Sequence, residues 1–196
     1  VSQVTSSLSN LSDATEVGTA GTSLAIAKKI QNMHCIYHPT EKVIVWIWHN
    51  TDGYSTNGSI QAKAGTVSST GVITFGSVVT PFSTSYAYGY AAALDEDTGR
   101  IGIVAGKNTG TEEVRFVSLT VSGTTLSVDQ HGVSGGVVLD TGRAGSPAYR
   151  VQSLVYDTNV NKFLALFTYI NNYNSQGEKK IKSKVGAYNS SSGDYD

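Results

Sequence analysis

The chain has 196 residues, of which 15% are charged, and its formal net charge is −1. A balance so close to neutral argues against the strongly basic surfaces with which proteins bind nucleic acid or anionic membranes. The single cysteine excludes a disulfide or a cysteine-based zinc cluster within one chain.

Glycine is frequent, with 21 residues, and separates short apolar runs, whereas proline occurs three times. This composition is typical of many short strands joined by tight turns. The longest apolar run, VIVWIW at residues 43–48, is far shorter than the ~20 residues of a membrane-spanning helix. The sequence therefore predicts an all-β protein.

The N-terminal segment, residues 1–32, can be interpreted in two ways. Its SLAIAKKIQNM stretch, from Ser23, has the propensity for a short helix. The same stretch precedes the first copy of a repeat, where later copies place a strand, and we therefore expect a strand. Because the chain begins without an initiator methionine or a leader, we expect it to be processed or part of a longer protein.

One motif occurs three times: an apolar strand, a polar turn closed by a basic residue, and a second apolar strand. The copies read CIYHPTEKVIVWIW, ALDEDTGRIGIVAG and LVYDTNVNKFLALF, and their closing bases are Lys42, Arg100 and Lys162. These bases lie roughly 60 residues apart, which predicts three copies of one structural unit. The sequence then divides into an N-terminal segment and three repeats: residues 1–32, 33–86, 87–149 and 150–196.

The polar turns are predicted to be hairpin loops. Residues 95–100 (DEDTGR) and 157–162 (DTNVNK) are rich in side chains that bond their own backbone. The first turn, residues 38–42, is expected to be one residue shorter, with Pro39 fixing its conformation.

Each repeat continues with a third strand of alternating pattern and, after a glycine-containing turn, a fourth strand. The alternating positions of the third strands are Ile60, Ala62 and Ala64, then Val114, Phe116 and Ser118, then Ile181, Ser183 and Val185. The fourth strands are VSSTGVITFG and VSGTTLSVD. The third repeat stops at YNSSSGDYD, where its fourth strand should begin.

The second strand of each repeat is apolar on both faces, and must therefore be covered on both sides. Antiparallel sheets stacked face to face as blades, as in a β-propeller, provide such cover, and a β-sandwich is the alternative. Three blades cannot close a ring, so we expect a partial propeller that is completed by further residues or by another chain. The N-terminal strand could supply the missing fourth strand of the last blade.

No pattern in the sequence indicates a catalytic, metal or cofactor site. The acids of DEDTGR alternate as in calcium loops but lack the other ligands, so a plain turn is the better interpretation. The histidines are scattered, and the loop acids are better explained as solvated turn residues than as a glycosidase pair. The histidines are His34, His38, His49 and His131, and the loop acids are Asp52, Glu112, Glu113 and Glu178. We therefore expect a protein that is not an enzyme.

Exposed aromatic rings are the better candidates for contact residues. Tyr54 and Tyr173 lie in long polar loops, the second beside Asn171 and Asn172, where flat rings with a polar tip suit sugars or proteins. Trp46 and Trp48 share one face of a central strand and are expected in the core. Cys35 is likewise expected to be a small buried hydrophobe.

These units resemble repeats in tail, fibre and other virion proteins of bacteriophages. The likeness is carried by Tyr156, Asp157 and Lys162, by their counterparts around Asp95 and Tyr37, and by VSSTGVITFG. It implies a structural or host-contacting component of an extracellular particle, whose partners are other virion subunits or further residues of the same polypeptide. A secreted carbohydrate-binding or glycan-cleaving propeller, with a host surface glycan as ligand, is the alternative.

Overall fold

The structure is a computed structural model that describes residues 29–51, 58–69, 71–107, 112–132, 134–141, 150–170, 179–191 and 194–195. Every regular element in these ranges is a β-strand, so the predicted all-β class is confirmed. The same ranges accordingly contain no helix that could cross a membrane. The strands are β1 (Lys29–His38), β2 (Val43–Thr51), β3 (Gly58–Val67), β4 (Ile73–Phe75), β5 (Val79–Leu94), β6 (Ile101–Lys107), β7 (Glu113–Ser122), β8 (Thr125–Asp129), β9 (Val137–Thr141), β10 (Arg150–Asp157), β11 (Lys162–Ile170), β12 (Lys179–Asn189) and β13 (Asp194–Tyr195).

The strands pair into two antiparallel sheets. The larger runs β1-β2-β3-β5-β6-β7-β8, with β4 also beside β3 and β9 also beside β7, and the smaller runs β10-β11-β12-β13. β5, with 16 residues, pairs with β3 through its first half and with β6 through its second half. The predicted boundary between the first two repeats, at residues 86 and 87, thus lies inside one strand. These two repeats share one sheet.

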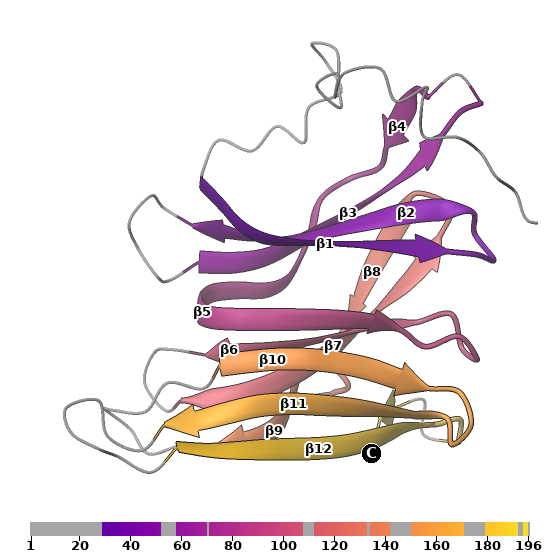
Figure 1. The fold of residues 1–196 in the computed structure, drawn as a ribbon. Coiled ribbons are helices and arrows are strands. Elements are labelled where there is room, and N and C mark those ends of the chain that lie inside the picture. The colour runs from indigo at the N-terminus through magenta and orange to yellow at the C-terminus, as the bar shows by residue number, and fades with distance from the viewer. Residues whose placement is uncertain are drawn as a thin grey trace, which may run out of the picture.

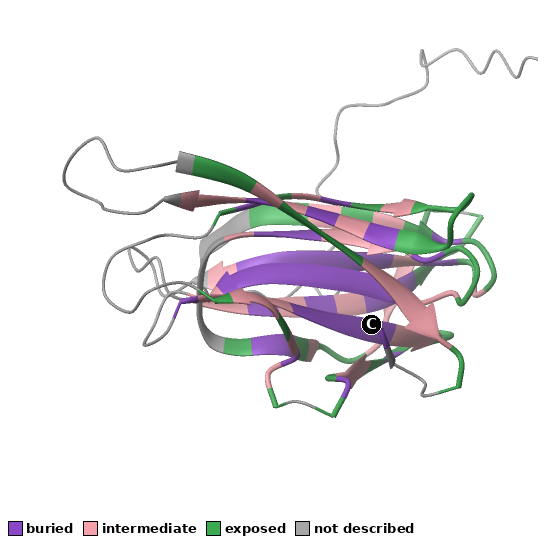
Figure 2. Cartoon of the chain, turned by 90° about the horizontal axis from the view of Figure 1, so that it is seen from below, coloured by how far each residue is buried: buried purple, intermediate pink, exposed green. Residues whose placement is uncertain are grey.

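Despite this continuity, the strands are stacked in three layers (Figure 1). We call β1–β4 the first layer, β6–β8 the second layer and β10–β13 the third layer, with β5 joining the first two. One hydrophobic core lies between the first and second layers, and another between the second and third. The second layer is therefore enclosed, and the buried residues gather on the inner strands of the stack (Figure 2).

β6 shows why the inner strands are apolar on both faces. Ile101 and Ile103 belong to the first core, whereas Val104, on the opposite face, belongs to the second, and all are fully buried. β11 differs, because Phe163, Ala165 and Phe167 face the second layer whereas Leu164 and Leu166 are only half-buried. In the described residues, no further layer covers the outer face of β11, so the cover expected for this strand is not found there.

The three hairpin turns have equal length, contrary to the expectation for the first. Each contains four residues between paired positions, and the fourth has a positive φ: 55° at Lys42, 71° at Gly99 and 55° at Asn161. His38, Asp95 and Asp157 precede these turns at equivalent positions. Of the closing bases, Arg100 and Lys162 are therefore equivalent to each other, whereas Lys42 matches Gly99 and Asn161.

The residue before each turn bonds the turn backbone. Asp95 Oδ1 accepts from the N–H groups of Asp97 (3.0 Å) and Thr98 (3.1 Å), and Asp157 Oδ1 accepts from that of Asn159 (2.9 Å). His38 acts likewise, because its Nδ1 accepts from the N–H of Glu41 at 3.2 Å. A histidine in place of aspartate hid this equivalence in the sequence.

Two other expectations concern the ends of the chain. β1 is the first strand of the first hairpin and pairs with β2, so the described part of the N-terminal segment does not complete the third layer. The expected strand in SLAIAKKIQNM is confirmed from Lys29 onwards, and the earlier residues lie outside the described ranges. The fourth strands of the first two repeats are β4 and β8, and β13 begins that of the third through the pair Tyr188 and Tyr195.

Candidate assembly surface

The predicted contact residues, Tyr54, Asn171, Asn172 and Tyr173, lie outside the described residues, as do Asp52 and Glu178. The remaining loop acids, Glu112 and Glu113, have different surroundings. Glu113 bonds Arg115 at 2.7 Å and lies 3.5 Å from Lys107. Although burial alone would raise the pKa of Glu113, these bases hold it below its usual value. Glu112 is buried, which raises its pKa.

Asp95 of DEDTGR and His131 both contact other side chains within the fold. Asp95 is fully buried, and its Oδ2 accepts a hydrogen bond of 2.7 Å from the hydroxyl of Tyr195. His131 is stacked on Phe116 and lies edge-on to Tyr195. In the described ranges, no three potential metal ligands of these kinds are grouped together. The interpretation of DEDTGR as a turn agrees with these contacts.

A polar cleft of about 470 Å³ lies beside the first two hairpin turns. Its walls carry the carboxylates of Glu41, Glu96 and Asp97 and the ring of Tyr188, a mixture found in sugar-binding sites. However, the guanidinium of Arg100 lies over the Tyr188 ring, 5.0 Å from its centroid. One face of the Tyr188 ring is therefore already occupied.

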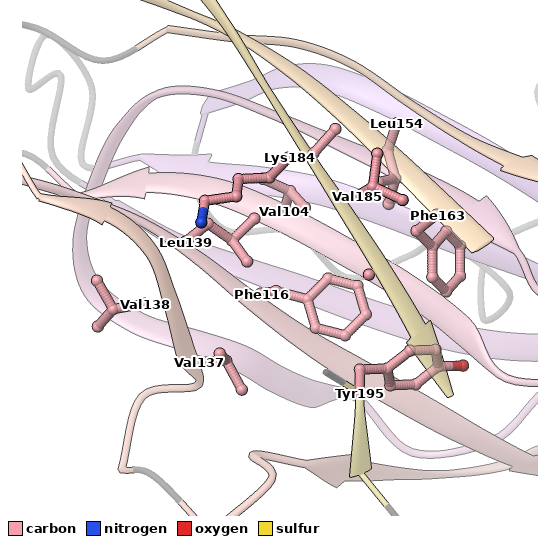
Figure 3. A pocket seen from close by; sticks show the side chains of 12 residues that line it. Val104, Phe116, Val137, Val138, Leu139, Leu154, Phe163, Lys184, Val185 and Tyr195 are labelled. Atoms are coloured by element: carbon pink, nitrogen blue, oxygen red, sulfur yellow. The ribbon is translucent and has the colours of Figure 1, made fainter. Parts of the chain in front are cut away.

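An apolar cavity of about 170 Å³ lies between the second and third layers (Figure 3). The rings of Phe116, Phe163 and Tyr195 form part of its wall, with Lys184 also lining it. These three rings also belong to the core that joins the two layers. The cavity is thus an incompletely filled part of that interface.

Hydrogen bonds between hairpin turns accompany the packing of each layer on the next. His38 Nε2 donates to the carbonyl of Gly99 at 2.7 Å, which joins the first and second layers. Tyr156 donates its hydroxyl proton to Asp97 at 2.6 Å, which joins the second and third. Each layer therefore recognises its neighbour through an apolar face and through its turn.

Because the three hairpin turns have equal length, residues at the same distance from each turn can be compared between the layers. Val45, Gly102 and Leu164 are equivalent, and so are Ile47, Val104 and Leu166, two residues further along the same face. The opposite strand extends the comparison, because Ala64, Ser118 and Val185 pair with the first set. In the first and second layers, these positions face the next layer, and every one of them is buried.

The third layer leaves the equivalent positions open. Val185 is 55% exposed and Ile181 is 81% exposed, and Leu164 and Leu166 are half-buried. Val155, which pairs with Leu164, is also exposed. We call this surface, made by residues 155, 164, 166 and 181, the open face. Ser183, which pairs with Leu166, lies on the same face. Exposed apolar side chains that share one face of a sheet are typical of an interaction site.

The edge of the third layer is open as well. Beside the first part of β3 lies β5, and beside the first part of β7 lies β9. In the described part of the chain, no strand holds the corresponding place beside β12. Strand edges bind other strands readily, so natural proteins cover them or pair them.

The opposite end of the stack also carries exposed apolar side chains. Met33 is 47% exposed and Tyr37 is 58% exposed, and Cys35 between them is exposed too. These residues pair with positions of β2 that face away from the second layer. The expectation of a buried Cys35 is therefore wrong. Trp46 and Trp48 are buried as expected, although they face away from the second layer.

Comparison with known proteins adds no family to this description. None of the known family models matches the chain, and none of the curated proteins is significantly similar to it in sequence.

Proposed function

We propose that this protein is a non-enzymatic structural module that acts through protein–protein assembly. In this proposal, the open face of the third layer binds another β-sheet. The observation that carries it is the set of equivalent positions: buried under the next layer in the first and second layers, half-buried or exposed in the third. An apolar face of this kind stabilises an assembly in proportion to the area removed from water.

The wider setting that we propose is the virion of a bacteriophage, in a tail or fibre. It is supported by the resemblance of the repeats to those of virion proteins and by a fold made of stacked sheets. Such a component is extracellular, and its partners are other virion subunits and, at its outer loops, the host surface.

The test is a charge on the open face. Ile181→Lys places an ammonium at a position that is 81% exposed, so the fold should be preserved. Association should weaken at least tenfold, because the charge must lose its water when a sheet docks there. The matched control is Val72→Lys, in the turn before β4, where the side chain is 58% exposed.

Light scattering over a range of concentrations provides the measurement. Wild type and Val72→Lys should form the same larger species, whereas Ile181→Lys should remain monomeric at the same concentrations. Equal association of all three proteins would show that the open face is not the binding surface.

Carbohydrate binding is the second candidate, and the polar cleft favours it by its carboxylates and its aromatic ring. A glycan array would detect a ligand, and Glu96→Gln, which alters an exposed carboxylate of the cleft, should then lose it. If no glycan binds, or if binding survives this change, the cleft is not a sugar site.

A further inference from the structure

We propose that the apolar cavity between the second and third layers binds a small aromatic carboxylate. The aromatic ring of this ligand fills the cavity, and its carboxylate binds the ammonium of Lys184 at the rim. The site is separate from the open face, so it adds a ligand to the proposed function and does not depend on it.

The size of the cavity restricts its ligand to a single ring. Its volume is about 170 Å³. An engineered apolar cavity of ~150 Å³ in another protein stays free of water and binds benzene. Pockets that hold drug-sized molecules are larger, at roughly 300–1,000 Å³. One six-membered ring therefore fits here, whereas a long acyl chain or a fused ring system does not.

Three aromatic rings in the wall favour a further ring as the occupant. The centroid of Phe116 lies 5.6 Å from that of Phe163 and 5.1 Å from that of Tyr195. The Phe163 and Tyr195 centroids are 5.4 Å apart. Tilted and edge-on contacts of this kind are the favourable geometries between aromatic rings, and a bound ring can extend them. The hydroxyl of Tyr195 is already bonded to Asp95, so the ligand gains no polar contact from it.

Among the described residues that line the cavity, Lys184 carries the only charge. It pairs with Ala165 across β11 and β12, so both side chains leave the sheet on the face that packs on the second layer. Lys182, two residues earlier on the same face, bonds Asp140 at 2.6 Å. Within the described ranges, no carboxylate is bonded to Lys184. Its charge is therefore available to an anion.

The cavity has an aromatic end and a cationic end. Figure 3 shows the Lys184 side chain extended, with its ammonium directed away from the rings of Phe163 and Tyr195. Those two rings are buried. Lys184 is exposed, and Val138 and Val185 of the wall are 38% and 55% exposed, so the cationic end is open to solvent. A ligand can enter ring first and keep its carboxylate at the rim, where water and the ammonium both stabilise its charge.

An NMR titration of the whole chain with sodium benzoate tests the site. Benzoate should bind one site per chain with a Kd of about 1 mM or lower, as expected for so small a ligand. Benzamide has the same ring without the charge and should bind about fivefold more weakly, the difference expected for one partly exposed ion pair. Acetate, which has the charge without the ring, should not bind.

Lys184→Met keeps the alkyl stem and removes the charge. It should weaken benzoate binding about fivefold and leave benzamide binding unchanged. The matched control is Lys162→Met, at an exposed lysine of the same layer that does not line the cavity, and it should bind benzoate as wild type does. Ala165→Met fills the cavity and should abolish binding of both ligands. If that variant does not fold, Leu139→Phe narrows the cavity from its half-buried rim and should weaken the binding of both.

Each other outcome overturns the inference. No saturable binding of benzoate would mean that the cavity is only a packing defect between the layers. Equal weakening by Lys184→Met and Lys162→Met would mean non-specific attraction to positive charge. Equal binding of benzoate and benzamide would mean that the site does not recognise a carboxylate. Binding that survives the filling variants would place the ligand elsewhere. None of these results alters the association expected at the open face, so the proposed function is tested separately.

Discussion

At the scale of single residues, Asp95 has the most consequential environment. It is fully buried, and its carboxylate accepts hydrogen bonds from two turn amides and from Tyr195, which belongs to the third layer. Burial alone would raise the pKa of Asp95, but these hydrogen bonds outweigh it and hold the pKa below its usual value. The charged form is therefore the one that stabilises the fold.

The first prediction is that stability decreases in acid through this residue. A carboxyl with a lowered pKa in the folded state stabilises it above the unfolded pKa of ~4, and this contribution is lost as pH falls below that value. Asp95→Asn should cost about 2 kcal/mol at pH 7 and flatten the acid decline in unfolding free energy. Urea denaturation at several pH values measures both effects. The control is Asp157→Asn, at the equivalent but exposed position, which should change both much less.

At the scale of elements, the side chains of β11 alternate between the two faces of the third layer. Ala165 is 3% exposed and packs in the second core, whereas its neighbour Leu166 is half-buried on the open face. Ala165→Asp should unfold the chain, because an unpaired buried charge costs several kcal/mol, comparable to total stability. Leu166→Asp should leave the monomer folded but prevent its association.

Thermal melts followed by circular dichroism, together with the molar mass in solution, test the two variants. If Leu166→Asp unfolded the chain as completely as Ala165→Asp, the outer face of β11 would have to be covered within the monomer. The account of an open face would then fail.

Elements governed by local rules could be predicted from the sequence. The hairpins and the third and fourth strands follow from turn chemistry and from alternation of period two. The double pairing of β5 could not be predicted, because an alternating run reads the same whether one strand continues through Tyr86 or two strands meet there. The apolar pattern of β11 indicated that the strand needs cover on both faces, but it could not say which chain provides that cover. The predicted loop contacts remain predictions.

At the scale of the whole molecule, the central claim is that the third layer presents a face which its two predecessors bury. The equivalent residues Ile60, Val114 and Ile181 allow a direct comparison, because each can be replaced by cysteine in a Cys35→Ala background. The first two are buried and the third is 81% exposed.

The decisive measurement is the rate at which these three cysteines react with a small thiol reagent, at low and at high protein concentration. In the native protein, Ile60→Cys and Val114→Cys should stay unreactive at both concentrations. Ile181→Cys should react rapidly when dilute and at least tenfold more slowly when concentrated, because association covers it. An unreactive Ile181→Cys in the dilute protein, or a rate that does not depend on concentration, would contradict the claim.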